Sequence, residues 1–227
     1  MLTFKGIRIV TVAAAGLVFA LAANGQSSNT SSTTAAPSGG TSASSTTSTP
    51  TQPAPKQAPP GARRNNQQQR IAQGVQSGQL TAGETQHLEN REAAISKETR
   101  QMRSQDNGNL TAADRARLNR QYNQTSKQIY NDKHNANTAH YGNNEVGQRR
   151  ENQQDRIAQG ISSGSLTARE AGKIEGQEKA INHQEAADRA ANGGKLTPAE
   201  RQQINKEQNK ESKNIYDKKH NAAKRKP

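Results

Sequence analysis

The chain contains no cysteine among its 227 residues. Disulfide bonds, thiolate metal ligands, a cysteine nucleophile and a lipid-bearing cysteine are therefore all excluded. Tryptophan is also absent, and aromatic residues make up only 3% of the chain, so residues that could stack on nucleic acid bases are scarce. A folded part of this chain must be held together by packing and hydrogen bonds, without covalent cross-links.

Apolar runs are confined to one N-terminal stretch, residues 9–22, which follows Lys5 and Arg8. Its end, Ala20-Leu21-Ala22, fits the small-x-small rule for cleavage, so we expect residues 1–22 to be a signal peptide. A retained membrane anchor is the alternative, although the stretch is short for a membrane span. With the signal cleaved, we expect no transmembrane segment and a periplasmic or secreted protein.

Large apolar side chains are missing from residues 23–62, where Ser, Thr, Ala and Pro dominate. Such a composition cannot bury enough apolar surface to offset the entropy of ordering the chain. We therefore expect this segment to be a disordered linker that acts as a spacer.

Internal repetition is the chain's most prominent feature. Residues 64–136 align without a gap with residues 150–222, an offset of 86. A gapless repeat of this length indicates duplication of one folding unit. We therefore expect a first helical repeat at 63–136, a connector at 137–149, a second helical repeat at 150–222 and a basic tail at 223–227.

Within each repeat the pattern Gly-x-Leu-Thr-x-x-acid occurs twice. Threonine at a helix N-cap accepts a hydrogen bond from the backbone N–H three residues on, and an acid there bonds back to the cap. The glycine supplies the left-handed turn that ends the preceding helix. The expected caps are Thr81, Thr111, Thr167 and Thr197, and the acids, hereafter the turn acids, are Glu84, Asp114, Glu170 and Glu200.

This pattern predicts an all-α fold of two tandem three-helix units. The predicted helices cover residues 63–76, 82–104, 112–133, 149–162, 168–190 and 198–219. Because hydrophobic residues make up only 29% of the chain, the apolar stripe on each helix is thin. We expect loosely packed helices, ordered further by a partner or by the two repeats packing on each other around a shared core.

The turns also resemble the second half of an EF-hand calcium loop. With Gly78 at loop position 6, Leu80 stands at position 8 and Glu84 at position 12. The first half lacks the carboxylates that calcium requires, and Arg103 and Arg189 stand at position 1 of two copies. The resemblance leaves the turn acids as an alternative divalent-cation site, with helix capping as the main interpretation.

A second motif closes each repeat, and it contains Tyr130, Lys133 and His134 in the first copy. The same residues return in the second copy as Tyr216, Lys219 and His220. One interpretation is a helix end whose Ile and Tyr pack inward, with Lys and His favourable to the helix dipole. The other is an exposed patch for a partner.

No Ser/His/acid spacing, phosphate-binding loop or paired-carboxylate pattern is apparent, so we predict no enzyme activity, no catalytic residues and no cofactor. The net charge of +13 and the pI near 10.2 favour anionic partners. Export and the scarcity of aromatic residues argue against nucleic acid and favour an anionic envelope polymer or a protein.

The elements RIxxGxxSGxLTxxE and LTxxERxxxNxxxNxxSxxIYxxKHN resemble a group of exported bacterial helical repeat proteins with no established activity. That resemblance implies a bacterial, envelope-side setting and supplies no substrate. We therefore predict an exported, non-enzymatic interaction or structural protein. The alternative is a calcium-responsive protein that uses the EF-hand-like turns.

Overall fold

A computed structural model describes residues 58–225, and this part of the chain contains six helices and no strands. They are α1 (Pro60–Gln76), α2 (Ala82–Gln105), α3 (Ala112–Lys133), α4 (Glu145–Ser163), α5 (Ala168–Ala191) and α6 (Pro198–His220). The prediction of an all-α fold with three helices per repeat is confirmed. The predicted signal peptide, most of the predicted linker and the last two residues of the basic tail lie outside the described residues.

Two helices begin earlier than the sequence pattern predicts. Helix α1 begins at Pro60, inside the predicted linker, because proline is well suited to the first helical position. Helix α4 begins at Glu145, inside the predicted connector, where the side chain of Asn144 accepts a hydrogen bond from the N–H of Gly147 at 3.1 Å. This extra turn buries Val146, which adds an apolar contact to the second repeat.

The turn between the first two helices of each repeat is closed by a glycine and a leucine. Gly164 has φ of 74°, and the N–H of Leu166 donates to the carbonyl of Gly160 at 2.9 Å. A Cβ on Gly160 would lie 2.6 Å from Leu166 Cδ1, so a larger residue there would displace the leucine. The corresponding residues of the first repeat form the same turn: Gly74, Gly78 and Leu80.

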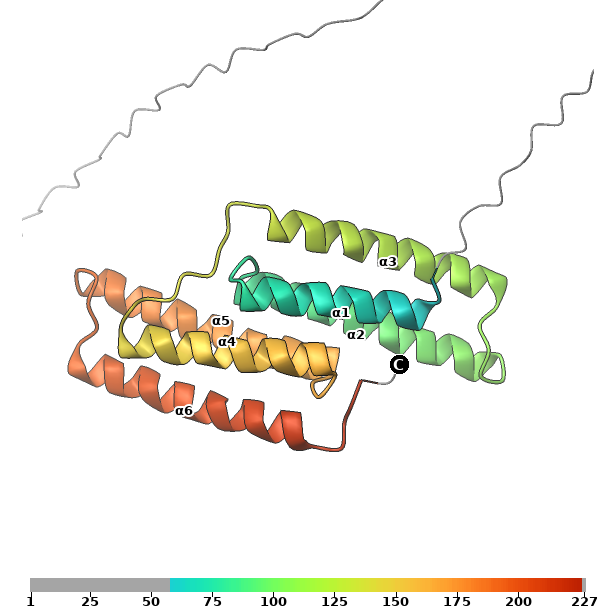
Figure 1. Cartoon of the computed structure of the whole chain (residues 1–227). Coiled ribbons are helices and arrows are strands. Elements are labelled where there is room, and N and C mark those ends of the chain that lie inside the picture. The colour runs from blue at the N-terminus through green and yellow to red at the C-terminus, as the bar shows by residue number, and fades with distance from the viewer. Residues whose placement is uncertain (1–57, 226–227) are drawn as a thin grey trace, which may run out of the picture. The chain divides into compact units, whose positions relative to one another are not determined.

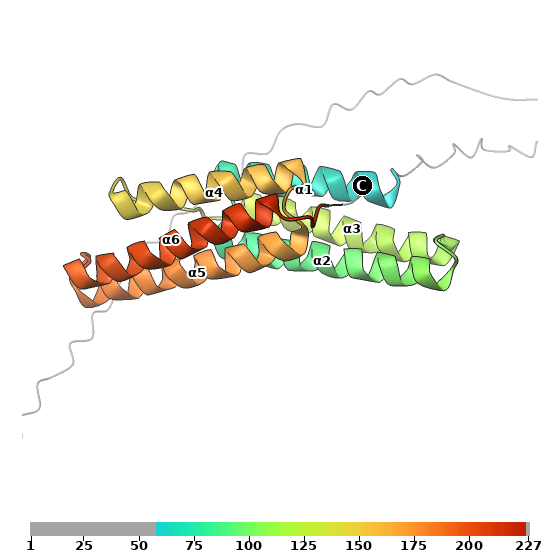
Figure 2. The same cartoon turned by 90° about the horizontal axis from the view of Figure 1, so that it is seen from below.

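Equivalent helices of the two repeats pack on each other in opposite directions. Figures 1 and 2 show α1 beside α4 and α2 beside α5, and the most extensive helix contact joins α2 to α5. Gln86 lies against Gly176, and Asn90 lies against Gly172. Gln86 is aligned with Gly172, and Asn90 is aligned with Gly176, so exchanging the two repeats turns one of these contacts into the other. The two repeats are therefore related by a local two-fold axis.

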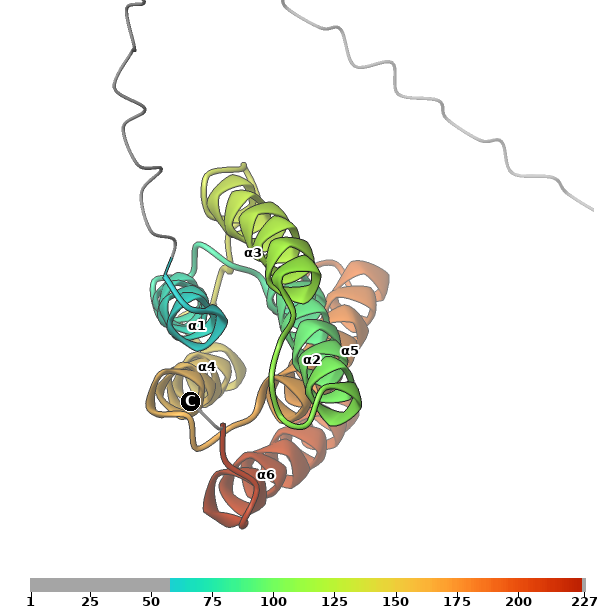
Figure 3. The same cartoon turned by 90° about the vertical axis from the view of Figure 1, so that its right-hand side faces the viewer.

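The outer helices α3 and α6 flank this four-helix centre on opposite sides (Figure 3). One hydrophobic cluster runs through both repeats and includes Ile71, Leu88 and Ile129 from the first and Ile157 and Ile174 from the second. The expectation that the two repeats pack on each other around a shared core is therefore confirmed.

The repeated motif residues tie the third helix of each repeat to the other two. Arg156 donates to the hydroxyl and the carbonyl oxygen of Ser212, both at 2.7 Å. Asn221 donates to the carboxylate of Glu170 at 2.6 Å. The first repeat makes the same contacts with Arg70, Ser126, Asn135 and Glu84. Much of the sequence identity between the repeats therefore has a structural cause.

Candidate anion-binding groove

A cleft of about 810 Å³ lies over the first repeat, between α1, α2, the start of α5 and the C-terminal segment. We call it the basic groove, because seven of its lining residues are cationic and none is acidic. The cations are Arg64, Lys97, Arg100, Arg103, Arg169, Lys224 and Arg225. A single-sign concavity of this kind concentrates field lines and attracts anions.

Helix α2 supplies a row of cations along one wall. Lys97, Arg100 and Arg103 stand three residues apart and so share one helix face. All three are exposed, and among the described residues none of them has an ion-pair partner. Ala93 and Ala94 leave space beside the row. At 1.5 Å per residue the wall from residue 90 to residue 103 extends about 20 Å, longer than a single small anion needs.

The C-terminal segment closes the opposite side of the groove. The N–H of Arg225 donates to the carbonyl of Gly164 at 3.0 Å. The Arg225 guanidinium donates to the carbonyls of Ile161 and Ser162, and also to Oε1 of Gln68 at 3.3 Å. These contacts fix Arg225 at the base of the groove, where it is half-buried, while Lys224 stays exposed.

The equivalent positions of the second repeat carry a different set of charges. Glu185 stands where the first repeat has Thr99, and it forms ion pairs with Arg150 at 2.9 Å and with Arg189 at 2.8 Å. These two arginines correspond to Arg64 and Arg103 of the groove. In the second repeat His183 and Ala186 replace the other two cations of the row, and Gly83 of the first repeat corresponds to Arg169. Concentrated positive charge is therefore a property of one repeat only.

Buried glutamates lie along the contact between α2 and α5, where Glu89 of the first repeat and Glu175 of the second are near enough to interact. Four carboxyl-bearing residues, which we call the interior glutamates, are fully buried: Glu89, Glu92, Glu175 and Glu178. Sequence analysis missed them, because acids on these helices read as solvated surface. One signal was nevertheless present in the sequence, since Glu89 and Glu92 recur as Glu175 and Glu178 in the second repeat.

Burial and mutual repulsion favour the neutral form of these carboxyls. Burial raises the pKa of Glu89 to about 7, although the hydrogen bonds from Gln68 oppose the shift. Burial and the nearby Glu89 raise the pKa of Glu92 to about 8. Burial, with repulsion from Glu211, raises the pKa of Glu178 to about 8. Burial also raises the pKa of Glu175 well above its ordinary value.

Two interior glutamates lack hydrogen-bond partners. Neither carboxyl oxygen of Glu92 or of Glu178 is bonded within the described part of the chain. The interior glutamates do not line the basic groove. They form a paired-carboxylate arrangement that the sequence pattern did not reveal.

The turn acids are engaged at their own helix ends. The Glu84 carboxylate accepts hydrogen bonds from the N–H and hydroxyl of Thr81, at 2.9 and 2.7 Å, and from the amides of Asn135 and Asn137. Partial burial raises its pKa, but these hydrogen bonds together lower it below the ordinary value. Equivalent capping contacts engage Asp114, Glu170 and Glu200. Within residues 58–225, no three His, Asp or Glu side chains are grouped as a metal ion would require.

The residues of the second motif do not form one patch. Tyr130 and His134 stack with ring centroids 4.2 Å apart on α3, and Tyr216 and His220 stack at 4.0 Å on α6. The expectation that these tyrosines pack inward is wrong, since they are 58% and 60% exposed. A helix turns 100° per residue, so burial of Ile129 directs its neighbour Tyr130 outward.

The motif lysines lie nearer to α1 and α4 than to the stacked rings. Lys219 donates to the carbonyl of Arg156 and to the side chain of Gln159. The side chain of Lys133 passes close to Gly74. Because α3 and α6 lie on opposite sides of the molecule, the two copies of the motif are separated (Figures 1 and 3).

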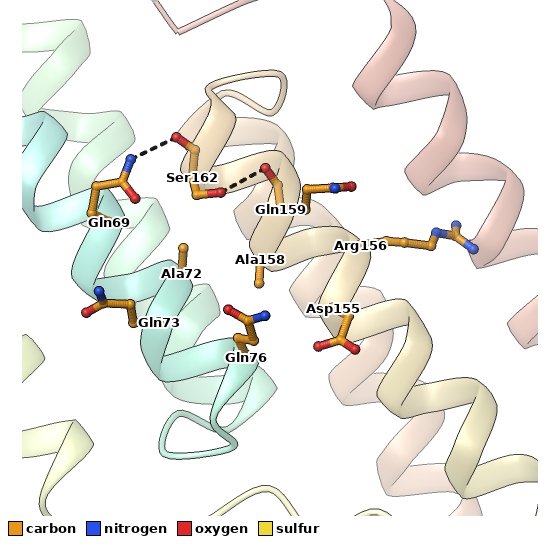
Figure 4. A pocket seen from close by; sticks show the side chains of 9 residues that line it. All are labelled: Gln69, Ala72, Gln73, Gln76, Asp155, Arg156, Ala158, Gln159 and Ser162. Atoms are coloured by element: carbon orange, nitrogen blue, oxygen red, sulfur yellow. Dashed lines mark hydrogen bonds between the residues drawn. The ribbon is translucent and has the colours of Figure 1, made fainter.

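A second cavity of about 510 Å³ lies between α1 and α4, where the two-fold axis passes (Figure 4). Gln73 and Gln159 line it as an equivalent pair, and Ala72 and Ala158 form a second pair. Arg156 points away from this cavity toward α6, where it bonds to Ser212. The remaining lining includes one acid and one cation, Asp155 and Arg156, so the cavity lacks the convergent positive charges of the basic groove.

These features define a class: an internally duplicated all-α protein whose repeats share one core and whose first repeat carries a basic groove. Comparisons with protein-family models, with curated proteins and with solved structures return no match for this chain. None of the helices between residues 58 and 225 is long and apolar enough to cross a membrane.

Proposed function

We propose that this protein is an exported, non-enzymatic interaction module that binds an anionic polymer of the cell envelope in the basic groove. The observation that carries the proposal is the set of seven cations, unaccompanied by an acid, around one cleft. The predicted signal peptide supports the periplasmic or secreted location, and the repeat resemblance supports a bacterial envelope.

The shape of the groove favours a polymer over a single ion. Its cations come from four separate segments. The α2 wall extends about 20 Å, and the three cations on it cover about 9 Å of that length. Arginine guanidinium groups bind phosphate and carboxylate groups through two parallel hydrogen bonds. An extended chain that carries such groups at intervals would contact several cations at once.

The absence of this charge from the second repeat supports a specific role. Glu185 pairs with two arginines there, at the position that Thr99 occupies in the first repeat. A cationic surface that served only solubility would not need to differ between two copies of one fold. The difference therefore favours recognition by the first repeat.

The test introduces the glutamate of the second repeat at the equivalent position of the first repeat. Thr99→Glu places a carboxylate between Arg64 and Arg103, as Glu185 stands between their counterparts. We expect full-length mature protein to bind a labelled linear polyphosphate with an affinity that falls as salt rises. Thr99→Glu should weaken this binding at least tenfold with an unchanged helical circular dichroism spectrum, and Arg103→Gln should weaken it and reduce the salt dependence.

Arg189→Gln is the matched control, because Arg189 is the counterpart of Arg103 and is already ion-paired. Binding should survive this change. Equal losses from Arg103→Gln and Arg189→Gln would show that only net charge matters, and would contradict the proposed groove. A single-stranded DNA of similar charge is added as competitor. Displacement of the polyphosphate by this DNA would indicate a general polyanion site, and retention of the polyphosphate would indicate selectivity for its chemistry.

A further inference from the structure

The floor of the basic groove is connected to the interior glutamates by one side chain. Gln68 is fully buried, and its amide nitrogen donates to both carboxyl oxygens of Glu89, at 3.1 and 2.9 Å. Its amide oxygen accepts from Arg225, which lines the groove. A cation that faces the ligand and a buried carboxyl are thus two hydrogen bonds apart.

Glu92 stands three residues after Glu89 on α2, is fully buried, and has neither carboxyl oxygen hydrogen-bonded within the described residues, so it depends on nearby cations to become charged. Arg64 and Arg225 both stabilise the charged form of this carboxyl, and both line the groove. Tyr122 of α3 also lines the groove and lies close enough to Glu92 for the two groups to influence each other's ionisation. A ligand in the groove and a charge on Glu92 therefore compete for the same positive field.

We propose that binding of an anion in the groove is linked to uptake of a proton by Glu92, so that the polymer is held at neutral or acid pH and released as the pH rises. This inference rests on the proposed function. An anion that pairs with Arg64 and Arg225 weakens the attraction between these arginines and the Glu92 carboxylate. The anion also repels the carboxylate. Both effects favour the protonated form of Glu92. By reciprocal linkage, a neutral Glu92 strengthens anion binding.

The other charged groups around Glu92 and Glu89 support this direction. From α2 itself, Glu89 opposes ionisation of Glu92 and Arg91 favours it. Across the helix contact, Glu175 of α5 and Glu89 oppose each other's ionisation. The acids near Glu92 oppose its ionisation, and two of the cations that favour it, Arg64 and Arg225, are groove residues that a bound anion would contact.

The sign follows from the raised pKa of Glu92, about 8. Below this pH the unliganded protein already holds the proton, and the groove presents its full positive charge. Above it, the carboxylate neutralises part of the field of Arg64 and Arg225. One linked proton can change the dissociation constant by up to about tenfold per pH unit.

The experiment measures the affinity of the mature full-length protein for a sulfated dextran oligomer between about pH 7 and pH 9.5. Sulfate esters keep their charge throughout this range. We expect the dissociation constant of the wild type to rise about tenfold or more across the range. Glu92→Gln, which mimics the protonated carboxyl, should retain its affinity at the high end.

Glu178→Gln is the matched control, since Glu178 is the two-fold equivalent of Glu92 and faces Arg150 and Arg156 instead of the groove. It should retain the pH dependence of the wild type. Calorimetry above about pH 8, in two buffers of different ionisation enthalpy, should detect proton uptake on binding by the wild type and less uptake by Glu92→Gln.

Coincident pH profiles of the wild type and Glu92→Gln would overturn the linkage while leaving the groove in place. Flattening of the profile by Glu178→Gln as well would also overturn it, since the pH dependence would then come from global stability. Absence of binding by the wild type at every pH would overturn the proposed function together with the linkage.

Discussion

Replacement of Glu178 by Gln tests whether the interior glutamates are neutral in the folded protein. Glu178 is fully buried, and neither of its carboxyl oxygens has a hydrogen-bond partner among residues 58–225. Burial raises its pKa to about 8 from an ordinary value of 4.5. At pH 7 folding must therefore transfer a proton to a carboxyl that is ionised in the unfolded chain. The free energy involved is about 1.4 kcal/mol for each pH unit above 4.5, or about 3 kcal/mol at pH 7.

The direction of the pH effect follows from which state holds the proton. Because the folded-state pKa is raised, the penalty is absent below about pH 4.5, grows as the pH rises and levels off above about pH 8. A glutamine never ionises and has nearly the same shape. We therefore expect Glu178→Gln to match the wild type near pH 4 and to unfold with a free energy about 3 kcal/mol larger at pH 7.

Urea denaturation of residues 58–227, followed by far-UV circular dichroism at several pH values, measures this difference. Glu151→Gln, at an exposed position of α4, serves as the control and should change little. A wild type that becomes more stable between pH 4.5 and pH 8, or a Glu178→Gln variant that is destabilised at pH 7, would refute the reasoning.

Three further perturbations test the turns and their contacts. Gly160→Ala should destabilise the protein by about 1–3 kcal/mol, because the new Cβ would lie 2.6 Å from Leu166. Gly83→Ala, whose new Cβ would have no contact closer than 3.6 Å, should be neutral or stabilising by up to about 1 kcal/mol. Urea titration compares the unfolding free energies of the two variants. Asn221→Ala removes the hydrogen bond to Glu170 and should lower the stability by about 1 kcal/mol, seen as a lower melting temperature. Millimolar calcium should leave the melting temperature unchanged relative to EDTA, because the turn acids already accept capping hydrogen bonds, and a clear rise would restore the calcium-responsive alternative.

The helices were predictable because their ends are determined locally. The Thr caps, the acids three residues on and the left-handed glycines all lie within a few residues of the helix boundary they set. The start of α4 was missed because Asn144 carries a cap without the Leu-Thr pattern of the other turns. Burial of Val146 and its contacts with residues of α5 and α6 then stabilise the extra turn.

The site was less predictable because its parts meet only in the folded chain. The cations of the groove come from α1, α2, α5 and the C-terminal segment, and no local spacing brings these segments together. One clue was nevertheless present in the sequence alignment of the two repeats, where Thr99 is aligned with Glu185. Sequence comparison alone shows that the charge differs, and only the structure shows that Glu185 neutralises Arg150 and Arg189.

The two-fold relation between the repeats adds a further argument about the interior glutamates. Near such an axis, a residue meets its own counterpart, so a charge there repels its copy. After duplication each copy can change independently, and two positions in the α2–α5 contact have done so: Gln86 and Asn90 correspond to Gly172 and Gly176. The interior glutamates have not diverged, although one apolar replacement would remove the repulsion. Their retention in both copies, although a buried carboxyl without full hydrogen bonding costs stability, is difficult to explain by packing alone.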